Sequence, residues 1–114
     1  MLFVTLMTYK AHLSRQQLDE ASQRRARWTY PTGLELIAEY WVQGSPQVIT
    51  IVEAEEIGPV LAANHTWLDI FEITTSPAVT VNEGLQALQM TGVIKRRGRR
   101  PKALAEAMRA AGNR

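Results

Sequence analysis

Apolar residues recur at every second position between residues 34 and 42, and a nearly continuous run of β-branched apolar residues covers residues 48–52. Both patterns are typical of β-strands. Gly44-Ser45-Pro46 stands between them and supplies the residue types of a tight turn. The stretch from residue 34 to residue 53 therefore predicts an antiparallel β-hairpin.

Two further segments, residues 2–9 and residues 68–75, have the composition of strands, and Pro77 should stop the second one. Residues 2–9 carry apolar side chains at both odd and even positions. An antiparallel strand with one solvated face alternates apolar with polar residues instead. We therefore expect both faces of this first strand to be covered.

Three segments show the apolar spacing and the end signals of helices. The predicted helices are residues 15–27, a short helix that begins near Glu55 or Glu56 and ends at about Asn64, and residues 81–90. Ser14 and Gln17 form a capping box at the start of the first helix. Arg24, Arg25 and Arg27 crowd its last turn, where cations favour the helix dipole, and we interpret them as helix-ending surface charges.

The order of elements is β-α-β-β-α-β followed by a helical extension, which is the order of the ferredoxin-like α+β fold. Two helices can cover only one face of a four-stranded sheet. Because the first and third predicted strands are apolar on both faces, the simplest cover for the other face is a second copy, packed sheet against sheet. We expect residues 1–90 to form this domain, residues 91–114 to form a basic, partly helical tail, and the chain to be a homodimer or a larger even-numbered oligomer.

The sequence also resembles a known family. Val52-Glu53-Ala54 at the approach to the second helix, Trp67 near its end and Pro77 after the next strand resemble, over residues 2–80, the uncharacterised family called domain of unknown function 3303. The resemblance implies a dimeric α+β barrel, an architecture shared with muconolactone isomerase and with cofactor-independent monooxygenases. The first residues, MLFVTLMTYK, are similar to the first strand of the isomerase.

The 114-residue chain is 46% hydrophobic, which suffices for one domain with a core of ordinary size. No apolar run reaches the roughly 18 residues that a membrane span needs, and the first residues lack the features of a signal peptide, so we expect a cytoplasmic protein. The absence of cysteine removes disulfides, thiolate nucleophiles and cysteine-based metal sites. His12 and His65 do not have metal-ligand spacing, so we expect neither a metal nor another cofactor.

Charge divides the chain into two parts. Residues 91–114 carry eight basic residues and one acidic residue, a net charge of +7, whereas residues 1–90 carry five basic and ten acidic residues, a net charge of −5. Six basic residues lie close together in the tail: Lys95, Arg96, Arg97, Arg99, Arg100 and Lys102. This basic cluster could contact phosphate groups of a nucleic acid, lie on the acidic body of a neighbouring subunit, or stay in solvent. The nucleic acid is the least supported of these partners, because no aromatic residue interrupts the cluster.

His65 and Trp67 are candidates for chemistry at the end of the second helix. A histidine titrates near neutral pH and can act as a general acid or base, and a tryptophan can wall an apolar pocket. The structural alternative is that His65 favours the helix dipole and that Trp67 packs in the core. We assign His65 as the candidate catalytic proton carrier and Trp67 as a candidate ligand-binding residue.

Tyr9, Tyr40 and Glu72 are further candidate ligand-binding residues, all on predicted strands. Polar-tipped aromatic residues orient ligands in pockets, although dimer interfaces use them as well. Tyr40 and Trp41 have opposite parity, so at most one of them faces a given pocket. A carboxylate in mid-strand, such as Glu39 or Glu72, is a candidate base if it is buried and a surface group if it is not.

These features predict a small dimeric α+β barrel protein that binds a small, partly apolar molecule or transforms it without a cofactor, as a monooxygenase-like or isomerase-like enzyme. The alternative is a non-catalytic interaction module whose basic tail contacts a neighbouring subunit or a nucleic acid.

Overall fold

The computed structural model describes residues 1–93 of the chain. Four strands and three helices occur in the predicted order, which confirms the α+β fold. The elements are β1 Leu2–Tyr9, α1 Arg15–Arg27, β2 Leu34–Trp41, β3 Val48–Ala54, α2 Gly58–Thr66, β4 Phe71–Ala78 and α3 Val81–Met90. The predicted basic cluster at residues 95–102 lies outside the described residues.

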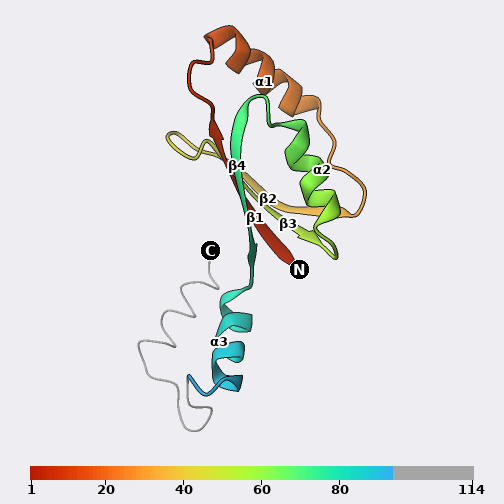
Figure 1. The fold of residues 1–114 in the computed structure, drawn as a ribbon, viewed down its shortest axis with the longest axis vertical. Coiled ribbons are helices and arrows are strands. Elements are labelled where there is room, and N and C mark those ends of the chain that lie inside the picture. The colour runs from red at the N-terminus through yellow and green to blue at the C-terminus, as the bar shows by residue number, and fades with distance from the viewer. Residues whose placement is uncertain (94–114) are drawn as a thin grey trace. The chain divides into compact units, whose positions relative to one another are not determined.

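The four strands form one antiparallel sheet in the order β2-β3-β1-β4, as in a ferredoxin-like fold. β1 is central, because it pairs with β3 on one side and with β4 on the other. β2 and β3 form the predicted hairpin, with a bulge between Leu36 and Ala38 that shifts the register by one residue. Figure 1 shows the strands running together, with α1 and α2 beside them.

One face of the sheet, which we call the helix face, packs against α1 and α2. Alternate residues of β1 point to this face, and Phe3 and Met7 are buried there. Met7 packs in one cluster with Ala21 of α1 and with Trp67, the residue after α2, whereas Phe3 packs in a second cluster with Val60 of α2. Both helices therefore cover the same face.

The opposite face of the sheet, which we call the open face, is not covered by any helix of residues 1–78. Leu6 of β1 is 38% exposed there, next to its register neighbour Ile49 of β3. The register places eight apolar residues on the open face: Leu2, Val4, Leu6, Ala38, Tyr40, Ile49, Ile51 and Ala78. Apolar residues of β1 thus lie on both faces of the sheet, α1 and α2 cover one of these faces, and cover of the other face stays a prediction.

α1 has the predicted bounds and the predicted start. The Ser14 hydroxyl accepts a hydrogen bond from the backbone N–H of Gln17, and the Gln17 side chain accepts one from the backbone N–H of Ser14. This capping box satisfies donors that the first helical turn would otherwise leave unpaired.

α2 begins later than the sequence predicts. Glu55 and Glu56 lie in the bend before the helix, which starts at Gly58 and runs to Thr66. Pro59 explains the shift, because its ring lacks an N–H group and fits only the first turn of a helix.

β4 is also displaced along the chain. We predicted residues 68–75 with Pro77 as the stop, whereas the strand spans Phe71–Ala78 and includes Pro77, which pairs with Phe3. Because β4 is an edge strand, half of its N–H groups face away from the sheet, and a proline can replace one of them. Residues 67–70 form a turn instead of the start of the strand.

α3 belongs to a different unit. The chain divides into a compact unit of residues 1–78 and a second unit that begins at Val79, and α3 lies in the second unit. The predicted domain boundary at residue 90 stays a prediction. A capping box of Thr80 and Glu83 starts the helix, and none of its residues is buried. No helix in the described part of the chain is long and apolar enough to cross a membrane.

Candidate functional site

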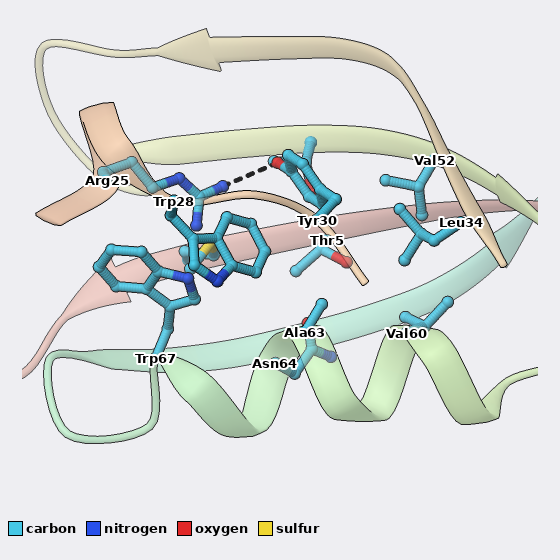
Figure 2. A pocket seen from close by; sticks show the side chains of 12 residues that line it. Thr5, Arg25, Trp28, Tyr30, Leu34, Val52, Val60, Ala63, Asn64 and Trp67 are labelled. Carbon is cyan, nitrogen blue, oxygen red and sulfur yellow. Dashed lines mark hydrogen bonds between the residues drawn. The ribbon is translucent and has the colours of Figure 1, made fainter. Parts of the chain in front are cut away.

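A pocket lies between the helix face of the sheet and the two helices α1 and α2. Its empty space is about 280 Å³ when the open mouth is included, but the centre of a water molecule can reach only about 10 Å³. Side chains fill most of the pocket, so the remaining space holds about one water-sized group. Figure 2 shows the residues around it: Thr5, Met7, Arg25, Trp28, Tyr30, Leu34, Thr50, Val52, Val60, Ala63, Asn64 and Trp67.

Trp67 is 1% exposed and forms one wall of the pocket. It directly follows α2, and its backbone N–H donates to the carbonyl of Asn64, which closes the helix. The indole ring meets the ring of Trp28 edge-on, with centroids 5.7 Å apart, and the ring of Phe71 at 6.0 Å. Its buried Nε1–H finds no hydrogen-bond acceptor among the described residues. A buried donor without an acceptor lowers the stability of a fold by about 1–3 kcal/mol.

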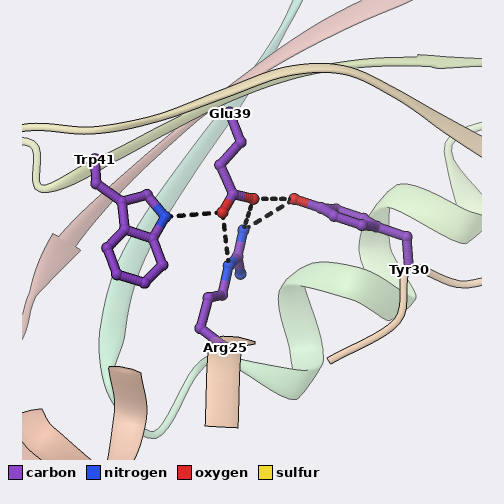
Figure 3. Close-up of polar contacts among 4 residues, drawn as sticks. All are labelled: Arg25, Tyr30, Glu39 and Trp41. Carbon is purple, nitrogen blue, oxygen red and sulfur yellow. Dashed lines mark hydrogen bonds and ion pairs between the residues drawn. The ribbon is translucent and has the colours of Figure 1, made fainter. Parts of the chain in front are cut away.

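Arg25 is a charged residue of α1 that is only 8% exposed. Its Nη2 donates to Glu39 Oε1 at 2.7 Å and to the hydroxyl oxygen of Tyr30 at 3.0 Å. The Tyr30 hydroxyl donates to the same carboxylate, and Trp41 Nε1 donates to it at 2.8 Å. Glu39 therefore accepts hydrogen bonds from three side chains (Figure 3), and it balances the charge of Arg25 inside the fold.

The pKa values of this cluster are shifted. Burial by itself raises the pKa of Glu39, but the hydrogen bonds outweigh burial, the one from Arg25 first, and hold the pKa below its ordinary value. Burial, and then the hydrogen bond to Glu39, raise the pKa of Tyr30 well above its ordinary value. Near neutral pH the cluster therefore contains a carboxylate and a protonated phenol.

Aromatic rings surround the guanidinium group of Arg25. Its central carbon lies 4.9 Å from the ring centroid of Trp28, 4.9 Å from that of Trp67 and 5.7 Å from that of Tyr30. A cation over an aromatic face is attracted by the ring quadrupole, most strongly where water is excluded. The aromatic rings thus help to hold Arg25 inside the core.

Arg24 reaches Trp67 as well, with its guanidinium carbon 4.3 Å from the ring centroid. It forms a two-pronged ion pair with Asp69, in which both N···O distances are 3.0 Å. The hydrogen bond from Arg24 lowers the pKa of Asp69. This pair is much more exposed than the pair of Arg25, with side-chain exposures of 42% and 58% against 6% and 19%.

Among the predicted site residues, Trp67 lines the pocket. His65 lies in the last turn of α2 and is exposed, outside the lining. Tyr40 is 58% exposed and lies on the open face, paired with Ile49. The role of His65 as a proton carrier stays a prediction.

Tyr9 and Glu72 lie at the end of the sheet where β1 meets the start of β4. Tyr9 stacks on Phe71 with ring centroids 5.0 Å apart and packs against the core cluster that contains Trp67. Glu72 is exposed and pairs with Thr8 on the open face. The structure thus brings Tyr9 near the pocket cluster and places Glu72 away from it.

Of the twelve lining residues, only Trp67 was predicted as a site residue, and the missed ones that matter most for its chemistry are Arg25, Trp28 and Tyr30. We interpreted Arg25 as a surface charge, but it follows Ala21 by four positions and therefore lies on the apolar stripe of α1. That spacing was the available signal. Nothing in the sequence marks Trp28 and Tyr30 as pocket walls, because they lie in the connection between α1 and β2.

No group of histidine, cysteine or acidic residues in the described part of the chain could hold a metal ion. The fold and the pocket define a small ferredoxin-like α+β protein with a partly polar interior site. Residues 1–92 match the model of the family described as "Domain of unknown function (DUF3303)", and the chain belongs to this family. No curated protein and no solved structure matches the chain.

Proposed function

We propose that the protein is a homodimer that binds a small, partly apolar molecule in the pocket between the sheet and the helices α1 and α2, without a cofactor. The observation that carries the proposal is the buried set of aromatic and polar side chains around Arg25 and Trp67. Ligand pockets are typically lined by apolar and aromatic side chains with a few fixed polar groups. Replacing a buried ion pair with well-packed apolar residues is often neutral or stabilising, so stability alone gives little reason for this pair.

The composition of the pocket supports binding more strongly than acid–base catalysis. Its ionisable lining residues are Arg25 and Tyr30, and the pKa of Tyr30 is raised. Neither accepts a proton near neutral pH. A monooxygenase-like or isomerase-like activity with His65 as the proton carrier is therefore the weaker candidate. The variant His65→Ala tests it, because a catalytic proton carrier should reduce turnover when removed.

The open face supports the homodimer. With strands about 4.8 Å apart and about 3.4 Å per residue, the open face has a footprint of roughly 500 Å². Two copies face to face would bury about 1,000 Å², which reaches the minimum expected for a specific interface. Leu6, Tyr40 and Ile51 would lie inside such an interface.

Binding in the pocket can be tested by titrating the full-length protein with benzoate, benzamide and benzylamine while tryptophan fluorescence is recorded. These probes share one ring, and Trp28 and Trp67 stand in the pocket wall. We expect at least one probe to bind saturably. The pocket-filling variant Ala63→Leu should weaken that binding about 10-fold or more, because Ala63 is a buried lining residue.

Ala62→Leu is the matched control, since Ala62 is exposed on the same helix. It should leave probe affinity unchanged. If no probe binds, or if both leucine variants bind like the parent chain, the proposed binding function is wrong.

A further inference from the structure

The indole N–H of Trp67 is an unusual feature of the pocket. The side chain is 1% exposed and lines the cavity, yet Nε1 has no acceptor among the described residues. Trp41 offers a contrast, because its Nε1 donates to Glu39 at 2.8 Å. Figure 2 shows the nitrogen of Trp67 on the side of the ring that faces the other pocket residues. The donor is therefore directed to a space that could receive an acceptor atom.

The groups around that space favour a negatively charged acceptor. The guanidinium carbons of Arg24 and Arg25 lie 4.3 Å and 4.9 Å from the ring centroid of Trp67. The Tyr30 hydroxyl and the Asn64 amide nitrogen both donate their hydrogen bonds, to Glu39 and to Thr75 respectively. Arg24 and Arg25 are each paired with a carboxylate, Asp69 and Glu39, but neither of these carboxylates lines the pocket, whereas Arg25 does. The lining therefore offers a cation to a ligand carboxylate and no carboxylate to an ammonium group.

The size of the space sets a second condition. A space of about 10 Å³ for the centre of a water molecule accepts one oxygen atom but not a ring. A ligand with a ring requires part of the wall to move. Apart from Trp67 itself, the part of the wall that lies in neither a helix nor a strand is the connection of residues 28–33 between α1 and β2, which carries Trp28 and Tyr30.

We propose that Trp67 Nε1–H is the recognition group of the pocket and that the ligand is a small carboxylate whose oxygen accepts this hydrogen bond. The inference deepens the proposed binding function and rests on it. The apolar body of the carboxylate lies against the aromatic wall formed by Trp28 and Tyr30. An equivalent ammonium compound is excluded, because an –NH₃⁺ group has no lone pair to accept the hydrogen bond.

Nuclear magnetic resonance of the indole N–H groups tests the proposal on the full-length chain. The chain contains three tryptophans, so a ¹⁵N-labelled sample gives three indole signals. Trp67→Phe identifies the signal of Trp67. On titration with benzoate this signal should move downfield as the hydrogen bond forms, while the signal of Trp41, already bonded to Glu39, serves as the internal reference.

Benzoate should bind about 10-fold more tightly than benzamide, and benzylamine should not move the Trp67 signal. Trp67→Phe keeps an aromatic ring but removes the donor, and it should weaken benzoate binding by about 10-fold. The two remaining indole signals report whether this variant is folded. If it is not, the titration of the parent chain decides the question alone.

The outcomes separate the two proposals. If benzamide or benzylamine binds as tightly as benzoate, or if the Trp67 signal does not move, the carboxylate assignment is wrong and the binding pocket stands. If none of the three probes binds, the proposed function fails, and the carboxylate assignment fails with it.

Discussion

Arg25 and Glu39 form an ion pair that is largely withdrawn from water, with side-chain exposures of 6% and 19%. Removing one charge from such a pair leaves the other buried without a counter-charge. We predict that Glu39→Gln lowers the free energy of unfolding by about 2–3 kcal/mol, somewhat less than for a fully buried pair. Urea unfolding at neutral pH measures the change.

Asp69→Asn is the matched control for that experiment, because Asp69 pairs with the neighbouring Arg24 in an exposed setting. Exposed ion pairs contribute little, so this variant should lose no more than about 1 kcal/mol. Equal losses in the two variants would show that burial of the Arg25 pair does not affect its contribution to stability.

Tyr30, in the same cluster, should make the stability of the fold depend on pH in the alkaline range. The folded chain holds the phenolic proton more tightly than the unfolded chain, whose tyrosine pKa is near 10. This contribution to stability is complete below pH 10 and is lost as the pH rises further, because the unfolded state then releases the proton first. We predict that the parent chain loses stability as the pH rises above about 10, and that Tyr30→Phe reduces this decline.

Denaturant midpoints measured from about pH 9 to about pH 12 check the prediction, with Tyr9→Phe as the control. Tyr9 is not among the pocket lining residues, and it pairs with the buried Phe71 rather than lying on the open face. Its variant should decline with pH like the parent chain. An unchanged alkaline decline in Tyr30→Phe would contradict the assignment.

At the level of single residues, the sequence allowed Trp67 to be predicted as a pocket residue but not Arg25. A large aromatic residue at a helix end next to an apolar strand has few places to lie other than the core. A terminal arginine can lie in solvent or, with a partner, inside the fold. The partner, Glu39, lies fourteen positions away on β2, so only the three-dimensional fold determines which of the two occurs.

Two segments approach each other closely at Gly33, before β2, and Pro59, in the first turn of α2. Gly33 has a φ of +91°, and a Cβ atom there would lie 3.1 Å from Pro59 Cγ. Gly44 in the hairpin turn also has a positive φ, +124°, but a Cβ atom there would meet nothing within 4 Å. Substitutions at the two glycines therefore distinguish the cost of backbone strain, which both share, from the cost of steric crowding, which only Gly33 has.

We predict that Gly44→Ala costs about 1–2 kcal/mol of stability from backbone strain alone. Gly33→Ala should cost at least about 1 kcal/mol more, because the stiff proline ring must also move. Denaturant unfolding of both variants measures the difference. Equal costs would show that the approach of Pro59 does not constrain the connection.

Element types were easier to predict than element ends. The capping box at Ser14 determined the start of α1, because it is a local interaction that needs no tertiary contact. The predicted starts of α2 and β4 were wrong. Acidic residues such as Glu55 and Glu56 usually mark the first turn of a helix, and a proline such as Pro77 usually ends a strand. In both cases the context decides: Pro59 restricts the helix, and the edge position of β4 tolerates a proline.

For the whole molecule, the apolar open face is the feature that bears most directly on the oligomeric state. Its presence could be predicted because β1 and β3 are apolar at both odd and even positions. The partner that covers the open face could not be predicted from the sequence. A period-two pattern shows which side chains are apolar, but it does not show what those side chains contact. An apolar face of this size in water favours self-association.

We predict that Leu6→Glu makes the chain monomeric if the proposed homodimer forms through the open face, because it places a carboxylate at the centre of that face, where two copies would bury it without a partner. Leu61→Glu is the matched control: Leu61 is 57% exposed on α2, away from the open face. Sedimentation equilibrium or native mass spectrometry of the full-length chains measures the subunit number. A dimer that persists in Leu6→Glu, or dissociates equally in Leu61→Glu, would place the interface elsewhere. A parent chain that is monomeric at micromolar concentration would remove the sheet-to-sheet dimer altogether, while the interior pocket, built within one chain, would keep its binding test.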